Sequence, residues 1–207
     1  MLRLIGSATT DTNGVASLNY TGKGVGLLDI VAKCENVESN QIEIADCLYY
    51  DRGSQADHNT NHSNYNSYFT VSYTDDYTDL KENSANHGRY SVTSGGNYLP
   101  IPFGYRIECD VKCVDGASSN TPFRIINPNA TSNITSSITI SALNMTVNTW
   151  CHCILDITSD GIIVTREDGT TTTKSLPNGV TSAVAMAFWG NDSITEIQFK
   201  NLKIYPV

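Results

Sequence analysis

Short stretches of alternating apolar and polar residues recur along this 207-residue chain, and Asn-Gly or Asp-Gly pairs separate many of them. Alternation with a period of two places the apolar side chains on one face of a β-strand. Asx-Gly pairs favour tight hairpin turns because both central residues of such turns adopt positive φ. The clearest hairpin is centred on Asp168-Gly169, between Ile163–Arg166 and Thr171–Lys174. Apolar residues with a helical period are absent over any useful length, so the sequence predicts an all-β sandwich or barrel.

The strand pattern also gives a map of the chain. Predicted strands are Val15–Tyr20, Gly26–Lys33, Gln41–Ile44, Phe69–Tyr73, Gly104–Val114, Phe123–Asn127, Ser137–Leu143, Trp150–Thr158, Gly161–Glu167, Thr172–Leu176, Ala183–Trp189 and Glu196–Tyr205. Between them, Asp51–Ser67 is almost devoid of aliphatic residues and is rich in Asn, Ser and His. That composition predicts a long loop packed on an edge of the sandwich, or a partly mobile segment.

The charge balance excludes two classes of partner. With 13 Lys and Arg against 21 Asp and Glu, the formal net charge is −8. Proteins bind nucleic acid and anionic membranes through clustered basic residues, so neither is expected as a partner. No apolar run approaches the roughly 18 residues of a membrane-spanning helix. The first ten residues lack the apolar stretch of a secretory signal, so we expect a chain cut from a longer one or one that needs no signal.

Four of the six cysteines lie in two alternating strands, Tyr105–Val114 and Trp150–Ile157. In both strands the cysteines are in phase with isoleucine, leucine or valine. Cysteine at such positions behaves as a small buried hydrophobe, so we expect buried thiols. A disulfide and a zinc site remain alternatives, although the usual C-x-x-C zinc spacing is absent. The four residues are Cys109, Cys113, Cys151 and Cys153.

The first part of the chain carries a separate set of motifs. Thr10–Ala16 contains an Asp and an Asn-Gly turn, Gly24 and Gly26 follow, and Leu28–Ala32 forms an apolar run. This order resembles the second half of a bacterial Ig-like domain of the invasin and intimin type. The resemblance implies a partial Ig-like spacer at residues 1–44, preceding a different domain at residues 45–207.

Residues 45–207 are similar to the concanavalin A-like lectin/glucanase superfamily, which includes the laminin-G-like sandwiches. The resemblance is carried by Tyr105–Val114, by Asn148–Cys153 with its following Asp-Gly turns, and by the closing strand Ile197–Pro206. It implies a jelly-roll β-sandwich. Because this superfamily includes both lectins and glycoside hydrolases, fold alone does not choose between binding and catalysis.

The carboxylates argue against hydrolysis. Retaining glycosidases need two carboxylates about 5–5.5 Å apart, and E-x-D-x-E strands supply them in the related hydrolases. Here Glu108 and Asp110 are followed by Lys112 where the last Glu belongs. We therefore expect no enzymatic activity, and expect these three residues to form a solvated or ion-paired face. His152, opposite in phase to the cysteines, is expected to be exposed or paired across strands, and no G-x-S-x-G motif is present.

Tyrosines and one tryptophan are the candidate ligand contacts. Aromatic faces contact the C–H surfaces of sugars, and interleaved Asn and Asp can bind hydroxyl groups. Packing between strands and a subunit interface remain alternative roles for the tyrosines, and Trp150 is expected to pack in the core. The candidates are Tyr65, Tyr68, Tyr73, Tyr77, Tyr90, Tyr98 and Trp189.

An acidic cluster is the candidate metal site. Calcium prefers several carboxylate and carbonyl oxygens, and Thr74–Asn83 contains four acidic side chains. A structural calcium ion is therefore the one cofactor considered. Its predicted ligands are Asp75, Asp76, Asp79 and Glu82.

Together these features predict a non-enzymatic attachment module of a phage, virion or cell-surface protein. Its expected partner is a host-surface glycan or polysaccharide, and its expected location is a virion or the cell exterior. The alternative is a structural virion or surface-layer component, in which the sandwich mediates assembly into a homo-oligomer. A degenerate glycan hydrolase is a third hypothesis.

Overall fold

A computed structural model describes residues 26–30, 33–34, 37–38, 42–46, 48–51, 62–64, 68–74, 76–83, 88–94, 97–129, 135–190 and 196–207. The chain divides into two compact units, Met1–Asp46 and Cys47–Val207. The predicted boundary after residue 44 lies two residues before this division. Where the structure describes the chain, no helix is long and apolar enough to cross a membrane.

The described part of the first unit consists of two short antiparallel pairs. Strand β1 (Gly26–Ile30) pairs with β4 (Ile42–Asp46), and β2 (Lys33–Cys34) pairs with β3 (Val37–Glu38). The strands predicted at 26–33 and 41–44 overlap β1 and β4. The strand predicted at 15–20 lies outside the described residues, and the Ig-like resemblance stays a prediction.

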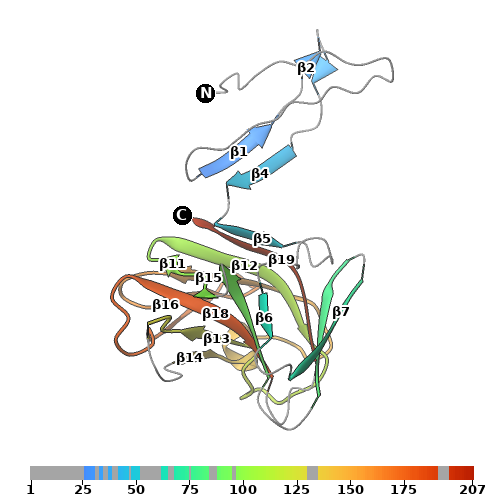
Figure 1. Cartoon of the computed structure of the whole chain (residues 1–207), viewed down its shortest axis with the longest axis vertical. Helices are drawn as coiled ribbons and strands as arrows, with labels where there is room; N and C mark the ends of the chain where they lie inside the picture. The colour runs from blue at the N-terminus through green and yellow to red at the C-terminus, as the bar shows by residue number, and fades with distance from the viewer. Residues whose placement is uncertain are drawn as a thin grey trace. The chain divides into compact units, whose positions relative to one another are not determined.

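The second unit is a sandwich of two antiparallel sheets (Figure 1). Among the described residues, the larger sheet has eight strands in the order β17-β16-β15-β12-β19-β8-β7, and β5 pairs with β19. Its strands are β5 (Tyr49–Asp51), β7 (Phe69–Tyr73), β8 (Thr78–Glu82), β12 (Tyr105–Cys113), β15 (Cys151–Ile157), β16 (Ile162–Thr165), β17 (Thr171–Lys174) and β19 (Glu196–Pro206).

The facing sheet has seven described strands. Its main path is β10-β9-β18-β13-β14, while β11 pairs with β18 and β6 pairs with β9. The strands are β6 (His62–Asn64), β9 (Arg89–Ser94), β10 (Asn97–Tyr98), β11 (Ile101–Pro102), β13 (Phe123–Ile126), β14 (Thr135–Ile138) and β18 (Ala183–Trp189).

The core lies between the two sheets. On the larger sheet, alternate residues of β12, β15 and β19 are buried, and β13 and β18 supply the facing apolar side chains. The ring of Phe188 from β18 stacks on that of Phe199 from β19, with centroids 4.2 Å apart. The predicted all-β sandwich is therefore confirmed, and alternation determined which residues point inward.

The four strand cysteines are free thiols and are buried, which confirms that part of the prediction. Burial raises the pKa of the Cys113 thiol to about 12. Hydrogen bonds to Cys109 and Cys151, together with burial, hold the pKa of Cys153 well above its usual value. The pKa of Cys151 is lowered because its sulfur accepts a hydrogen bond from Cys153, with the two sulfur atoms 3.8 Å apart.

The hairpin predicted at Asp168-Gly169 is present between β16 and β17, and Gly169 adopts φ 81°. The strand predicted over Ser137–Leu143 is wrong in its second half. Strand β14 ends at Ile138, and a short helix, α2 (Ile140–Leu143), follows. The Thr139 hydroxyl accepts a hydrogen bond from the backbone N–H of Ala142 and so caps the start of this helix.

The loop predicted over Asp51–Ser67 is also partly wrong, because β6 lies within it. The His62 ring stacks on Tyr90, with centroids 4.6 Å apart, and the Tyr49 hydroxyl bonds to its Nε2 atom. These aromatic contacts hold in place a segment whose own sequence is too polar to predict a strand.

Candidate functional site

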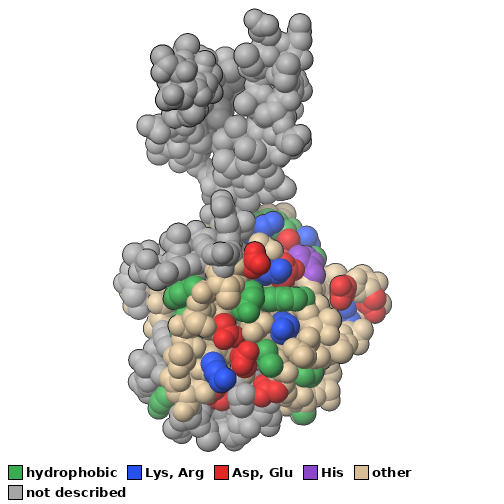
Figure 2. Space-filling model, turned by 90° about the vertical axis from the view of Figure 1, so that its right-hand side faces the viewer, with side chains coloured by type: hydrophobic (Ala, Val, Ile, Leu, Met, Phe, Trp, Pro, Cys, Tyr) green, Lys and Arg blue, Asp and Glu red, His purple; other side chains and the backbone are tan. Residues whose placement is uncertain are grey.

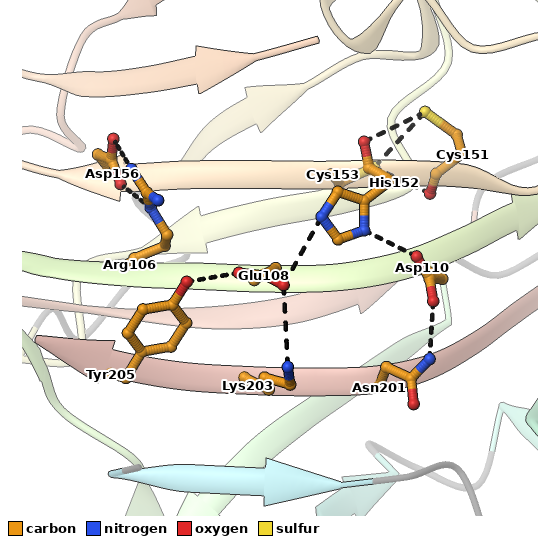
Figure 3. Close-up of polar contacts among 10 residues, drawn as sticks. All are labelled: Arg106, Glu108, Asp110, Cys151, His152, Cys153, Asp156, Asn201, Lys203 and Tyr205. Carbon is orange, nitrogen blue, oxygen red and sulfur yellow. Dashed lines mark hydrogen bonds and ion pairs between the residues drawn. The ribbon is translucent and has the colours of Figure 1, made fainter. Parts of the chain in front are cut away.

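The outward face of the larger sheet carries a group of polar side chains over its three central strands. Because Ile107, Cys109 and Val111 of β12 point into the core, the alternate residues of β12 point outward. The same alternation applies to β15 and β19. We call the resulting group the polar cluster; Figure 3 shows its members, Arg106, Glu108, Asp110, His152, Asp156, Asn201, Lys203 and Tyr205.

His152 of β15 lies between two carboxylates of β12 (Figure 3). Its Nδ1 atom is 2.8 Å from Oδ1 of Asp110, and its Nε2 atom is 3.6 Å from Oε1 of Glu108. The His152 side chain is 45% exposed. The predicted pairing of His152 across strands is thus confirmed, and both acids contact a side chain of the neighbouring strand.

A β-bulge brings Asn201 into the cluster. The register places Lys203 opposite Glu108 but Lys200 opposite Asp110, so Asn201 and Leu202 both face Cys109. Asn201 adopts φ 53°, a left-handed conformation that Asn tolerates better than most residues. Its side-chain amide donates to Oδ2 of Asp110 at 2.8 Å. A bulge commonly re-aims one side chain in this way.

Glu108 accepts a hydrogen bond from the hydroxyl of Tyr205 and lies 4.0 Å from the ammonium group of Lys203. Partial burial and the bond to Glu108 raise the pKa of the Tyr205 phenol to about 12. The phenol is therefore protonated at neutral pH and acts as the donor.

At the other end of the cluster, Arg106 forms a two-pronged ion pair with Asp156. The guanidinium Nε and one terminal nitrogen donate to the two carboxylate oxygens at 2.6 and 2.9 Å. This hydrogen bonding raises the pKa of Arg106 above its usual value.

Acidic and basic side chains are interspersed on the face of the second unit seen in Figure 2.

Trp150 lies just before β15 and continues the outward face. The side chain is half-buried, and its ring meets that of Tyr77 edge-on with centroids 5.7 Å apart. The ammonium groups of Lys200 and Lys112 lie 4.7 and 6.0 Å from the Trp150 centroid. We call these four residues the aromatic platform.

The expectation that Trp150 packs in the core is therefore wrong. Trp150 is in phase with His152 and out of phase with Cys151, and this phase was already visible in the sequence. Sequence reasoning missed Trp150 as a site residue because tryptophan at the start of a strand was assumed to be buried.

Among the described residues, the aromatic side chains predicted to contact a ligand lie at different positions on the two sheets and do not form one surface. Tyr77 lies in the aromatic platform, whereas Tyr68, just before β7, and Tyr73, at its end, are half-buried. Tyr98 is half-buried on the other sheet, where the Arg89 guanidinium lies 5.6 Å from its ring centroid. Tyr65 lies outside the described residues.

Two of these predictions are wrong because the side chains are buried. Tyr90 is 3% exposed and stacks on His62. Trp189 is 6% exposed, and the Arg124 guanidinium lies 4.0 Å from its ring centroid. Neither ring presents a face to a ligand.

The predicted calcium ligands do not form one cluster in the part of the chain that the structure describes. Asp76 is exposed in a turn, and Asp79 points outward from β8, where one oxygen lies 3.4 Å from the Ser72 hydroxyl. Glu82 points to the opposite face and accepts from the Gly88 backbone N–H at 2.8 Å. No described group of three His, Cys, Asp or Glu side chains is placed to hold a metal ion. Asp75 lies outside the described residues, and calcium binding stays a prediction.

Comparison with known proteins identifies the fold. No protein-family model and no curated protein matches the sequence. A Bacillus subtilis protein of unknown function with a galectin-like fold is similar over 77% of this chain and 96% of its own, with a TM-score of 0.52 and 9% identity. A sialidase is similar over 80% of this chain, with a TM-score of 0.52 and 9% identity.

A third similar structure comes from work on endo-acting O-glycanases that human gut microbiota express to initiate mucin breakdown. It covers 78% of this chain and 99% of its own, with a TM-score of 0.50 and 11% identity. This chain spans 19% of the length of the sialidase chain. At these identities the similarity identifies a β-sandwich with a galectin-like fold and no activity.

Proposed function

We propose that this protein is a non-enzymatic glycan-binding module and that the outward face of its larger sheet is the binding surface. The observation that carries the proposal is the position of the half-buried Trp150 ring beside the polar groups of Asp110, His152 and Asn201. A sugar ring presents apolar C–H groups on its faces and hydroxyl groups around its edge. An aromatic ring next to fixed donors and acceptors matches both features.

The polar cluster is suited to binding because its members are already held in place. Asp110 accepts hydrogen bonds from both His152 and Asn201, and Glu108 accepts from Tyr205. Side chains fixed by neighbours lose little conformational entropy when a ligand binds. The similar solved structures include proteins named for sialidase and O-glycanase activity. These names support a sugar as the ligand and do not identify which sugar.

The arrangement of the carboxylates supports binding over hydrolysis. Glu108 and Asp110 are linked through one histidine, and Lys112 occupies the next outward position on β12. A retaining glycosidase needs a nucleophile and a separate proton donor on the two sides of the scissile bond. Lys112 stands where the E-x-D-x-E strand of related hydrolases has its last glutamate, and His152 engages the two remaining acids, so this strand does not provide that division of roles.

We extend the proposal to the biological setting predicted from the sequence: attachment of a phage, virion or cell-surface protein to a host-surface glycan. The division into two units is consistent with a spacer followed by a terminal binding domain. Assembly of sister subunits through the same face is the competing function, and the test below distinguishes the two.

The test is a glycan-array screen of the full chain, with light scattering on the same sample, in calcium and in chelator. Trp150→Ala is the site variant. Tyr98→Ala is the matched control, because Tyr98 is also a half-buried aromatic residue but lies on the other sheet. We expect saturable binding to one class of glycan that Trp150→Ala abolishes and Tyr98→Ala retains.

Two results would overturn the proposal. Absence of binding together with a stable oligomer that Trp150→Ala disrupts would assign the face to subunit assembly. Release of reducing sugar from a bound glycan would identify a hydrolase. Binding in calcium that disappears in chelator would support a calcium-dependent site in addition.

A further inference from the structure

Two lysines of the aromatic platform have no carboxylate partner among the described residues. Elsewhere on this sheet face the described cations are paired: Arg106 with Asp156, Lys203 with Glu108, and Lys81 with Glu196. Lys112 and Lys200 instead lie near the ring of Trp150.

The carboxylate nearest to Lys200 in the strand register is already engaged. Asp110 is directly opposite Lys200, but one of its oxygens lies 2.8 Å from His152 and the other accepts from Asn201 at 2.8 Å. Lys112 is opposite Gln198, which is neutral. The ammonium groups of two half-buried lysines therefore lie near one aromatic ring without a neutralising carboxylate from the described residues.

We propose that the glycan bound by this face is acidic. Its carboxylate or sulfate group contacts Lys112 and Lys200, while the sugar ring that carries the acid packs beside Trp150. This inference rests on the proposed glycan-binding function and assigns the chemical class of the ligand. The two lysines come from neighbouring strands, β12 and β19, so the sheet fixes the backbone positions from which both side chains extend.

The negative charge of the whole protein limits which kind of acidic ligand Lys112 and Lys200 can bind. At a net charge of −8, the chain as a whole repels a polyanion. At physiological salt that repulsion is screened beyond about 8 Å, whereas a direct contact with two ammonium groups persists. The site therefore fits a glycan with a discrete acidic group better than a densely charged polymer.

The experiment measures binding of the full chain to an array of neutral oligosaccharides together with their carboxylated and sulfated counterparts. The site variant is Lys112→Gln combined with Lys200→Gln, and the Arg replacements at both positions retain the charge. Lys81→Gln is the matched control, because Lys81 lies on the same sheet face but pairs with Glu196. Thermal unfolding of each variant is measured alongside.

We expect the acidic glycans to bind more tightly than their neutral counterparts. The double Gln variant should lose about tenfold in affinity for the acidic forms, with little change for the neutral forms. The double Arg variant and Lys81→Gln should retain the preference. The carboxylated and sulfated arms identify which acid the lysines accept.

Equal binding of neutral and acidic forms by the unmodified chain would overturn this inference and leave the glycan-binding function intact. A double Gln variant that only melts at a lower temperature, with an unchanged ratio of acidic to neutral binding, would show that the lysines merely stabilise Trp150. Absence of binding to every glycan would overturn the inference and the proposed function together.

Discussion

The imidazole of His152 lies 2.8 Å from the carboxylate of Asp110, Nδ1 to Oδ1, across the pairing of β15 with β12. These are directly opposite residues on the outward face, and their contact fixes the orientation of both side chains. Because Asn201 holds the second oxygen of Asp110, this carboxylate is anchored from both neighbouring strands. Asp110 is thus the central fixed acceptor of the candidate site.

The first prediction concerns this contact. His152→Ala should weaken glycan binding at least about fivefold, because Asp110 and Glu108 lose the group that lies between them. The side chain is 45% exposed, so the cost in folding stability should stay within about 1 kcal/mol. Isothermal titration calorimetry and thermal unfolding measure the two effects. A large fall in the melting temperature with unchanged binding would show that His152 is structural.

The same substitution should cost more stability at Trp189 than at Trp150, and only the change at Trp150 should abolish glycan binding. Trp150→Ala should abolish glycan binding at a cost of about 1 kcal/mol in stability, because the ring is half-exposed. Trp189→Ala should cost about 3 kcal/mol, because it empties a buried site against Arg124. Denaturant unfolding of both variants checks the prediction. Equal losses of stability would contradict the assignment of Trp150 to the surface.

The raised pKa of Tyr205, at about 12, gives a prediction for alkaline pH. The unfolded phenol titrates near pH 10, so the folded protein binds the proton more tightly. The stability from this group is therefore fully present below about pH 10 and is lost as the pH rises through about 12. Ultraviolet difference absorbance should show a late tyrosine titration that Tyr205→Phe removes. A variant with the same titration curve would contradict the hydrogen bond to Glu108.

The strand cysteines should be protected in the native protein. Cys113, with a pKa of about 12, should react with iodoacetamide at least about tenfold more slowly in buffer than in denaturant. Of the four, Cys151 should react first, because its pKa is lowered by the bond from Cys153. Peptide mapping by mass spectrometry identifies each labelled position. Rapid native labelling of Cys113 would contradict burial of the inward face of β12.

Alternation in the sequence predicted the inward faces correctly. It identified Cys109 and Cys113 of β12 and the cysteines of β15 as buried. Alternate residues of any strand point to opposite faces, so the apolar set faces the core wherever the strand covers one. It also identified the outward positions of Glu108, Asp110 and His152. Local turn chemistry was equally reliable at Asp168-Gly169, where two residues determine the bend.

The aromatic residues were the least predictable part. Trp150 and Trp189 have the same chemistry, and the sequence alone assigned the first to the core and the second to a ligand. Trp150 is nevertheless half-buried and Trp189 is buried, because β18 is buried on both faces, with Ala185 and Ala187 fully covered, whereas β15 is exposed on one. The phase of a strand is local, but which faces are covered depends on the other segments of the chain.

The amino-acid pattern was enough to predict an all-β protein, the inward-facing residues of its central strands and the position of the main hairpin turn. The candidate site could not be predicted in this way, because it depends on how distant strands pair. Asp110 and Asn201 are 91 residues apart, and a bulge in the pairing of β12 with β19 directs the amide toward the carboxylate. Strand alternation follows from backbone geometry within a few residues, whereas strand pairing and bulges depend on contacts between distant segments.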